Sequence, residues 1–403
     1  GLMRSLQEQG FTFDYGGSHI IFSKDHEALD MMKNLMGDNM VKNRRNTKVL
    51  YKDHYIKYPF ENGLSDLPRD DNFECLYHFI QNLIRKEKEV IASPRNLREW
   101  FYYTFGSGIS DKYLLPYNEK IWKTDPSALG LEWVGGRVPE PPLEDVLKSA
   151  LGIETEGDTH QLYFHYPRAG GIEALVRAIE GRVRAVEKNF PVRKIRRRGG
   201  EWIVSDGRRE KAYDRLVSTI PLPDLLGAMD GVPPAIRDAA RGLRNNSIIC
   251  VMVAFRAERP SERFAVYFPQ PRLIFHRVCF YDYFGGCCTP PGVSSAVAEV
   301  TAREGGEISA MTDEELAERV AAGLEGEGFL SRGDVVATRV ARRKYAYVVN
   351  DLGYADAVAA VRGFVRERGI VLCGRFAEWE YLNMDACARR AIDCAAGLKG
   401  GGG

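Results

Sequence analysis

A glycine and an arginine that follow a short apolar run near the end of the chain could bind a charged or polar ligand. The run covers 370–373, Gly374 and Arg375 come next, and a small-residue helix is predicted from about Asn383 to Leu398. A strand that passes into a helix through a glycine presents backbone N–H groups to an anion or a polarised carbonyl. Gly374 lets a ligand approach the backbone, and Arg375 can reach its oxygens. An ordinary turn with a surface arginine fits the residue types equally well.

Two further sets of residues suit a ligand-binding surface. Gly16 and Gly17 let a flat ring system lie against the backbone, with His19 beside it. Asn118 and Trp122 share one face of a predicted helix and suit stacking or hydrogen bonding to a cofactor. The alternatives are a buried histidine bonded to the backbone and an aromatic stripe in the core, and both are common.

Arginines occur in two contrasting settings. The basic run 193–198 lies on a predicted hairpin and is best interpreted as a solvated face, so nucleic-acid binding is not expected. Arg277 stands between Phe275 and Phe280 on a predicted sheet. Because an apolar strand seldom carries an arginine inward without a partner, Arg277 is the better candidate for an anion contact.

The composition excludes several classes of function. Lysine and arginine total 56 against 55 acidic residues, so the net charge of +1 favours neither nucleic acid nor an anionic membrane. No apolar run is long enough to span a bilayer. The eight cysteines, of which Cys287 and Cys288 are adjacent, form no C-x-x-C pair, and the seven histidines show no zinc spacing. We therefore expect no metal site and a reduced, cytoplasmic setting.

The spacing of apolar residues predicts the helices and strands that position these candidate residues. The stretch to about Leu151 is mostly helical, and its apolar stripe Phe73, Leu76, Tyr77, Ile80 and Ile84 shares one helix face. A hairpin is predicted over 192–205, and a larger antiparallel sheet from 247 to 301. With the closing strand, glycine and helix, the order predicts an α/β protein with an inserted sheet and an inserted helical part.

Taken in order, six segments resemble the UDP-galactopyranose mutases, especially the eukaryotic type. They are GFTFDYGGSHIIFSKD, YPFENGLSDLP, REWFYYTFGSGISDKYLLPYNEKIWKTDP, LEWVGGRV, DRLVSTIPL and GRFAEWEYLNMD. These flavoenzymes share their fold with protoporphyrinogen and amine oxidases. The resemblance implies a discontinuous FAD-binding, Rossmann-like domain (1–24, 160–220 and 365–403), a helical substrate domain (62–151) and an antiparallel sheet domain with helices (25–61 and 221–364). Enzymes of this kind begin with a strand, a Gly-rich turn and a helix, roughly 30 residues that precede Gly1, so we expect an N-terminally truncated chain without its first βαβ unit.

The resemblance also assigns roles to residues. It implies FAD contacts at Gly16, Gly17, His19, Gly374, Arg375, Asn383, Met384 and Asp385. It implies substrate contacts at Asn118, Trp122, His165, Arg277, Tyr347 and Tyr381, with His19 and Arg277 closest to the reaction. Ser18 is an insertion in the usual Gly-Gly-His, and His165 stands where the family has an arginine that binds the diphosphate. Losing that fixed cation weakens the expectation of a nucleotide diphosphate.

The implied activity is the interconversion of pyranose and furanose forms of a UDP-sugar through an adduct at N5 of reduced FAD, with NADPH or NADH as possible reductant. The substitution at His165 favours a first alternative, an oxidoreductase of the protoporphyrinogen or amine oxidase type. A second alternative is a non-catalytic fragment that binds a sugar nucleotide. The expected partner is a small molecule, and the oligomeric state stays open.

Overall fold

The structure is a computed structural model that describes residues 1–89, 91–135, 138–155, 162–257 and 261–400. Residues 136–137 of the LEWVGGRV segment and 160–161 of the predicted FAD-binding domain lie outside these ranges. The helices are α1 (His26–Met36), α2 (Arg69–Glu87), α3 (Leu97–Ile109), α4 (Leu115–Trp122), α5 (Leu143–Ala150), α6 (Glu173–Glu180), α7 (Leu222–Ala228), α8 (Pro234–Arg241), α9 (Glu307–Ala310), α10 (Asp313–Gly326), α11 (Tyr354–Glu367) and α12 (Met384–Gly400). The strands are β1 (Ser5–Glu8), β2 (Phe11–Asp14), β3 (Val41–Arg44), β4 (Thr47–Tyr51), β5 (His54–Lys57), β6 (Tyr163–Tyr166), β7 (Lys194–Arg198), β8 (Glu201–Ser205), β9 (Glu210–Tyr213), β10 (Leu216–Ser218), β11 (Asn245–Arg256), β12 (Ala265–Tyr267), β13 (Arg277–Phe280), β14 (Val293–Ala302), β15 (Val335–Val348) and β16 (Ile370–Leu372).

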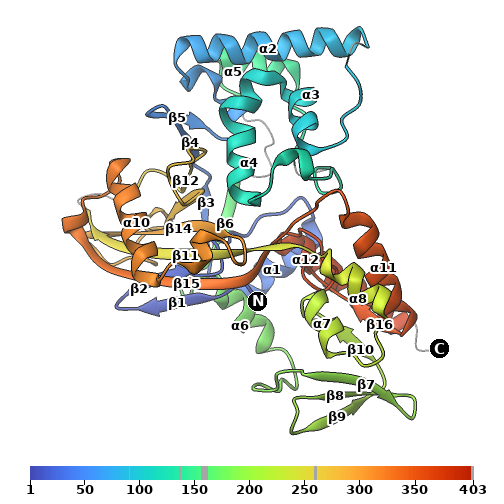
Figure 1. Cartoon of the computed structure of the whole chain (residues 1–403). Helices are drawn as coiled ribbons and strands as arrows, with labels where there is room; N and C mark the ends of the chain where they lie inside the picture. The colour runs from blue at the N-terminus through green and yellow to red at the C-terminus, as the bar shows by residue number, and fades with distance from the viewer. Residues whose placement is uncertain (90, 136–137, 156–161, 258–260, 401–403) are drawn as a thin grey trace.

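The largest sheet has seven strands in the order β15-β11-β14-β13-β12-β4-β5. It crosses the middle of the molecule in Figure 1. Its neighbours are antiparallel except β12 and β4, which run parallel. The predicted antiparallel sheet is therefore present, and the mixed α/β class is confirmed.

Strand β11 is buried on both of its faces over 248–255, which explains why this part of it is an unbroken apolar run. On β11, Ile248 and Cys250 belong to the core beneath the helical part, while Ile249 and Val251 belong to the core beneath α10. Alternate residues point to opposite faces of a strand, so a run with two buried faces keeps no polar positions.

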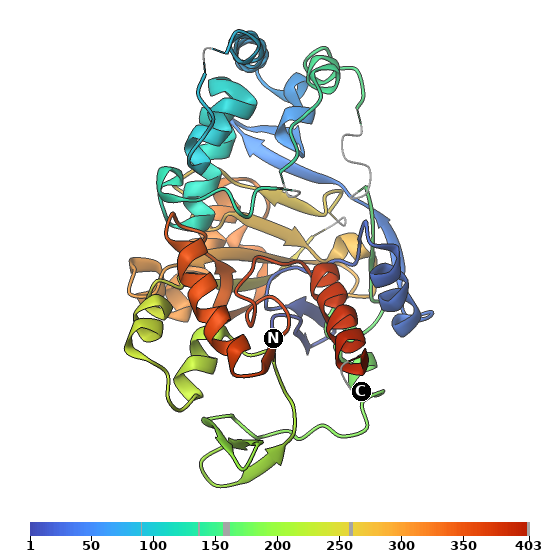
Figure 2. The same cartoon turned by 90° about the vertical axis from the view of Figure 1, so that its right-hand side faces the viewer.

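Helices α2 to α5 form the helical part, which stands above the opposite face of the sheet (Figures 1 and 2). Helix α4 packs against β14 and buries Asn118, Ile121 and Trp122. This contact places the predicted substrate residues of α4 directly over the sheet.

A parallel pair, β10 and β16, lies beside α7, α8 and α11 (Figure 1). It pairs Leu216 with Ile370 and Ser218 with Leu372, and α12 follows from Met384 as predicted. The division into three domains stays a prediction. Across the described ranges, no helix combines the length and the apolar character that crossing a membrane requires.

Helix α2 shows one difference from the usual packing of an apolar stripe. Its buried side chains are Asp71, Cys75, Phe79 and Asn82, while the stripe through Phe73 faces outward. The periodicity predicted a helix correctly, but of this stripe only Leu76 is among the residues that pack against the core, while Phe73, Tyr77 and Ile84 are exposed.

Candidate functional site

A cavity of about 700 Å³ lies between the helical part and the sheet. Five of the predicted site residues line it: Asn118, Trp122, Arg277, Tyr347 and Tyr381. The size falls in the range of pockets that enclose small organic ligands.

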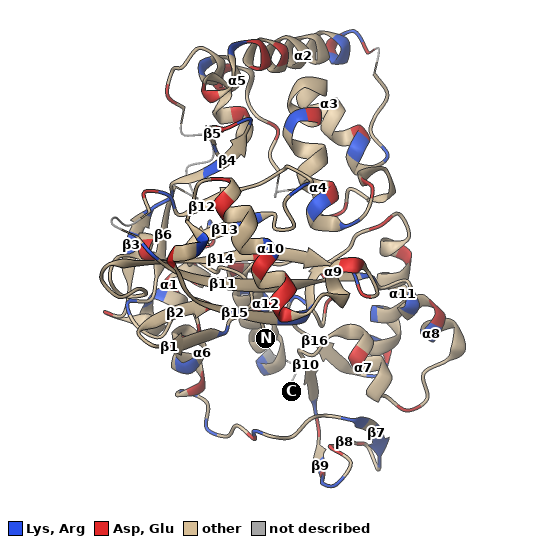
Figure 3. Ribbon diagram, turned by 60° about the vertical axis from the view of Figure 1, so that its left-hand side comes forward, with Lys and Arg blue, Asp and Glu red and all other residues tan. Residues whose placement is uncertain are grey.

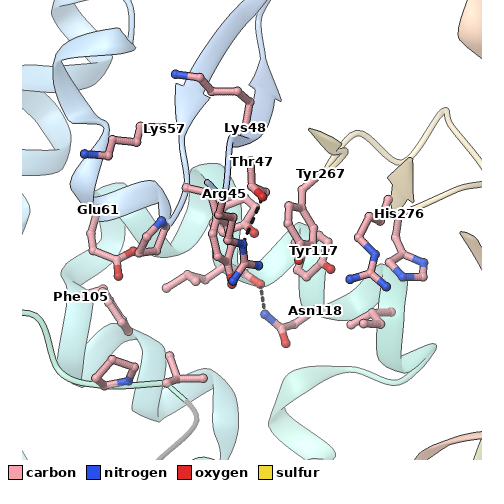
Figure 4. Close-up of a pocket in the computed structure, with 18 of the residues that line it drawn as sticks. Arg45, Thr47, Lys48, Lys57, Glu61, Phe105, Tyr117, Asn118, Tyr267 and His276 are labelled. Atoms are coloured by element: carbon pink, nitrogen blue, oxygen red, sulfur yellow. Dashed lines mark hydrogen bonds between the residues drawn. The ribbon is translucent and has the colours of Figure 1, made fainter. Parts of the chain in front are cut away.

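Cationic groups enter the cavity mainly from β3, β4 and β5. Arg45 projects into its centre, with Glu61 on one side and Tyr117 and His276 on the other (Figure 4). The Arg45 Nε donates to Thr47 Oγ1 (3.2 Å). Among the described residues, the cationic ones that line the cavity are Arg44, Arg45, Lys48, Lys57 and Arg277, and the acidic ones are Glu61 and Glu154; Lys48 also pairs with Asp66, and Arg277 with Glu299. The excess of cations favours an anionic ligand.

Glu61 is the buried carboxyl group of this cavity, with 8% of its surface exposed. Burial raises its pKa to about 7, because a carboxylate removed from water is costly. Glu61 can therefore carry a proton near neutral pH and act as a hydrogen-bond donor to a ligand.

Aromatic rings form a continuous wall along the cavity. Tyr58 stacks on Tyr267 at 4.9 Å between centroids, and Tyr117 meets Tyr267 edge-on at 5.3 Å. At the other end Tyr381 contacts Trp122 (5.6 Å) and Tyr347 (5.8 Å). Such rings can stack on a base or a sugar ring.

Asn118 and Trp122 are bonded to each other. The Trp122 Nε1 donates to Asn118 Oδ1 (3.0 Å), and Asn118 Nδ2 donates to the Leu114 carbonyl (2.7 Å). Both side chains are buried, so Asn118 fixes the tryptophan ring in the cavity wall.

Arg277 has the inward position that the sequence predicted, and its partner is Glu299 of β14. Nη2 of Arg277 lies 2.6 and 2.7 Å from the two carboxylate oxygens of Glu299, which is fully buried. Burial lowers the pKa of the guanidinium, but Glu299 outweighs that effect and the pKa lies well above its ordinary value. The neighbouring His276 stays neutral because burial and Arg277 lower its pKa well below the usual value.

The Gly16–His19 loop lies within reach of the same charges. Ser18 N donates to Glu299 Oε1 (2.8 Å), and Nδ1 of His19 lies 2.6 Å from the Gly17 carbonyl. A carbonyl only accepts, so Nδ1 carries the proton and Nε2 keeps its lone pair. Burial lowers the pKa of His19 to about 4, and the charges of Arg375 and Arg277 lower it further, while the Gly17 carbonyl and Glu299 act in the opposite direction without outweighing burial.

The C-terminal turn continues from β16 into α12. Gly374 has a φ of +93°, and its N–H donates to Glu378 Oε1 (2.8 Å). Nη1 of Arg375 donates to the Leu382 carbonyl (2.6 Å), and the guanidinium lies 4.4 Å from the Tyr381 ring centroid. Arg375 thereby links the predicted cofactor turn to the aromatic wall.

The remaining predicted residues have structural contacts of their own. A Cβ on Gly16 would stand 2.0 Å from the Leu2 carbonyl oxygen, so this glycine is required by packing. Asp385, at the start of α12, accepts from Ser23 Oγ (2.6 Å), and Asn383 and Met384 adjoin it. The roles of these residues toward a cofactor stay predictions.

His165 is not among the residues that line the cavity. It pairs through its backbone with Ile21, and burial together with Lys33 and Lys42 lowers its pKa. The sequence reasoning missed His276, Glu299 and the cationic segment 44–48. The charged residues of the sequence RRNTK could have indicated segment 44–48. The acidic Glu299, which stands among apolar residues of β14, could have indicated a buried ion pair.

The chain belongs to the family of flavin-containing amine oxidoreductases, whose family model matches residues 1–347. Its structure is also similar to that of reduced UDP-galactopyranose mutase, with a TM-score of 0.87 and 25% sequence identity. That match covers 99% of this chain and 86% of the mutase chain.

Two other solved structures share the fold at lower identity. An Exiguobacterium protein assigned as a protoporphyrinogen oxidase gives a TM-score of 0.75 at 16% identity, over 98% of this chain and 89% of that one. A redesigned putrescine oxidase gives a TM-score of 0.63 at 13% identity, over 98% and 90%. At such low identities, both similarities show that the fold is shared and say nothing about function.

The family implies a flavin cofactor, and the residues at the carboxyl ends of β10 and β16 fit one. A Cβ built on Gly374 meets nothing within 4 Å, so the turn faces open space. Beside it the buried Ser218 hydroxyl finds no hydrogen-bond partner in the described parts of the chain. An open, polar position at the carboxyl end of parallel strands is where α/β folds hold nucleotide cofactors. No cluster of side chains that could hold a metal ion occurs in the same ranges.

Proposed function

We propose that the protein interconverts the pyranose and furanose forms of a UDP-sugar, UDP-galactose in the first instance, with reduced FAD. The observation that carries the proposal is the combination of cationic side chains and stacked aromatic rings in one cavity. The cationic side chains that line the described part of the cavity suit a diphosphate, and the rings suit a base and a sugar. The similarity to the mutase, at 25% identity, supports the same substrate class.

When bound, the reduced flavin supplies a nucleophilic nitrogen for the anomeric carbon, and the cofactor rather than the protein carries the covalent chemistry. Gly374, Arg375 and the Gly16–His19 loop would hold the cofactor. Arg277, fixed by Glu299, can donate hydrogen bonds from its remaining N–H groups to the diphosphate that leaves. His19 keeps its proton on Nδ1, so Nε2 is the ring atom that can accept one from a sugar hydroxyl.

The cavity walls orient the sugar nucleotide. Trp122, held by Asn118, and Tyr381 bound the end of the cavity nearest Arg375. Tyr58 stacks on Tyr267 farther along the same wall, and the Arg45 guanidinium lies over the Tyr58 ring.

The test is a spectrum followed by an activity assay. The purified protein is saturated with FAD, its visible absorption is recorded, and it is reduced with dithionite and incubated with UDP-galactopyranose. A flavin spectrum with formation of the furanose isomer is the expected result. A flavin spectrum without any isomer would overturn the proposal.

An FAD-dependent oxidoreductase is the second candidate. The family itself is described as an amine oxidoreductase family, and His165 lies away from the cavity instead of adding a fixed cation to it. Oxygen consumption with an amine or a porphyrinogen, in the absence of a sugar nucleotide, would favour this candidate. Binding of UDP in the absence of FAD would favour a non-catalytic binding protein.

A further inference from the structure

Two adjacent cysteines occupy the loop between β13 and β14. Cys287 and Cys288 are free thiols, and their Sγ atoms lie 3.6 Å apart. Neighbouring side chains of an extended chain point to opposite sides, so a contact between adjacent sulfur atoms requires a bent backbone. Gly285, with a φ of +84°, and Gly292, with a φ of +77°, supply the conformations that bend this loop at its two ends.

The two thiols differ in their access to solvent. Cys287 is partly exposed, whereas Cys288 is only 1% exposed. In its protonated form the Cys287 thiol donates to the Phe284 carbonyl (3.3 Å), which fixes the direction of its side chain. A small reagent from solvent can therefore reach the Cys287 sulfur, while Cys288 can react through its neighbour.

The surroundings favour the thiolate form of Cys287. A hydrogen bond from Cys288 lowers the pKa of Cys287, and the positive charge of Arg168 lowers it further, although burial acts in the opposite direction. The same contact, together with burial, raises the pKa of Cys288. The thiolate is the nucleophilic form of cysteine, and reactive cysteines lie in electropositive, partly exposed surroundings. Cys287 is therefore suited to attack first, and Cys288 to follow as the second thiol.

The cysteine loop is fixed to the strand that leads to the Gly16–His19 loop. The Thr12 N–H of β2 donates to the Cys288 carbonyl (2.8 Å). Because β1 pairs with one edge of β2, this bond occupies the other edge of the strand. At the end of β2, Asp14 accepts from the Tyr166 hydroxyl of β6 (3.0 Å), and the two strands lie close together on one side of the molecule (Figure 3). A change in the backbone at Cys288 therefore acts directly on β2.

We propose that Cys287 and Cys288 form a reversible disulfide when the protein meets hydrogen peroxide. The Cys287 thiolate attacks one oxygen of the peroxide, the O–O bond breaks, and the leaving hydroxide takes up a proton, so that Cys287 becomes a sulfenic acid. Cys288 Sγ then attacks the Cys287 sulfur, the S–OH bond breaks, and the hydroxide departs as water with the Cys288 proton. The two thiols lose two electrons in total, and the peroxide is reduced to two molecules of water.

The ring that this disulfide closes is strained. The Cα atoms of adjacent residues are about 3.8 Å apart, whereas those of most disulfides are about 4.4–6.8 Å apart. A strained disulfide is easily reduced, so a thiol such as glutathione should restore the pair. Closing the ring also changes the backbone angles at both cysteines, which weakens the bond between the Cys288 carbonyl and the Thr12 N–H.

Mass spectrometry of the full chain tests the proposal. Cleavage after Phe284 and Arg303 releases a peptide that contains these two cysteines and no other. After brief treatment with hydrogen peroxide and alkylation of free thiols, this peptide should have lost two hydrogen atoms, and reduced glutathione should restore them. Two alkylated thiols after the treatment, or an oxygen adduct at Cys287 in place of the disulfide, would overturn the proposal.

Single variants separate the roles of the two thiols. Cys288→Ala should stop the oxidation at the sulfenic acid of Cys287, which dimedone traps. Cys287→Ala should leave Cys288 unmodified, because Cys288 is buried. Cys387→Ala is the matched control, since Cys387 is also a partly exposed free cysteine, and the disulfide should form in it as in the wild type. Equal trapping by dimedone in the first two variants would contradict the order of attack.

Hydrogen exchange tests the connection to β2. Amide exchange in segment 11–14 should be about threefold to tenfold faster in the oxidised protein than in the reduced protein, because the Thr12 N–H loses a hydrogen bond. Cys288→Ala treated with peroxide is the control and should show no further increase. Unchanged exchange in a wild-type protein that carries the disulfide would show that the cysteine loop does not act on β2.

Discussion

The carboxylate of Glu299 holds Arg277 with two contacts of 2.6 and 2.7 Å and also accepts the backbone N–H of Ser18. One fully buried acidic group on β14 thus joins the arginine of the cavity to the loop that carries His19. The position of the loop and the position of the arginine therefore depend on each other.

Glu299→Gln keeps the shape of the side chain but leaves the Arg277 charge without its counter-ion. Breaking a buried pair in this way costs about 3–5 kcal/mol, because the remaining charge stays desolvated. We expect a loss of that size in the free energy of unfolding, measured by urea denaturation. Glu144→Gln, which breaks the exposed pair with Lys148, is the control and should change stability little. Equal effects of the two variants would show that Glu299 does not balance Arg277.

Arg277→Lys tests the proposed grip on a diphosphate. A lysine cannot keep both the carboxylate of Glu299 and a phosphate in a fixed, planar geometry. We expect UDP to bind about tenfold to a hundredfold more weakly in calorimetry, equivalent to about 1.5–3 kcal/mol, with the flavin spectrum unchanged. Arg339→Lys serves as control, since Arg339 pairs with Glu8 on the surface of the sheet. Unchanged affinity in Arg277→Lys would place the diphosphate elsewhere.

The sequence predicted the inward position of Arg277 but not its partner. An arginine within an apolar strand signals burial by itself, whereas the pairing with Glu299 depends on how β13 and β14 lie in the sheet. Glu299 is the only charged residue of β14, and that local signal was available. The outward face of α2 could not be predicted, because periodicity identifies an apolar face without saying what covers it. The cavity itself joins segments from several distant parts of the chain, which no local pattern reveals.

His19 should make stability depend on pH on the acidic side. Its pKa is about 4 in the folded protein against 6.5 for the free group. As the pH falls below 6.5 the unfolded chain takes up a proton that the folded protein refuses, so stability is lost until about pH 4. The loss is up to about 3 kcal/mol at 1.36 kcal/mol per pKa unit. Urea unfolding of wild type and His19→Gln from pH 7.5 to 4 measures it, and parallel profiles would contradict the assignment.

Glu61 should have the opposite dependence. Its pKa is raised from 4.5 to about 7, so the folded state holds a proton that the unfolded chain releases. The stabilising effect is complete below pH 4.5 and is lost as the pH rises through 7, by up to about 3 kcal/mol. Glu61→Gln should remove this loss, so its stability relative to wild type should increase between pH 4.5 and 7.5. A constant difference over that range would show that Glu61 titrates as an exposed acid does.

Asn118→Leu tests whether Asn118 positions Trp122 or only forms hydrogen bonds with a bound ligand. The change leaves Trp122 Nε1 and the Leu114 carbonyl without their bonds of 3.0 and 2.7 Å. Each buried polar group left unpaired costs about 1–3 kcal/mol, so ligand-free stability should fall by about 2–4 kcal/mol. Trp122→Phe removes the same Nε1, so the two changes combined should cost about 1 kcal/mol less than their sum. If Asn118 contacted only a ligand, the stability losses of the two single variants, measured without ligand, would be additive. Asn118 would then not be the residue that fixes Trp122 in the cavity wall.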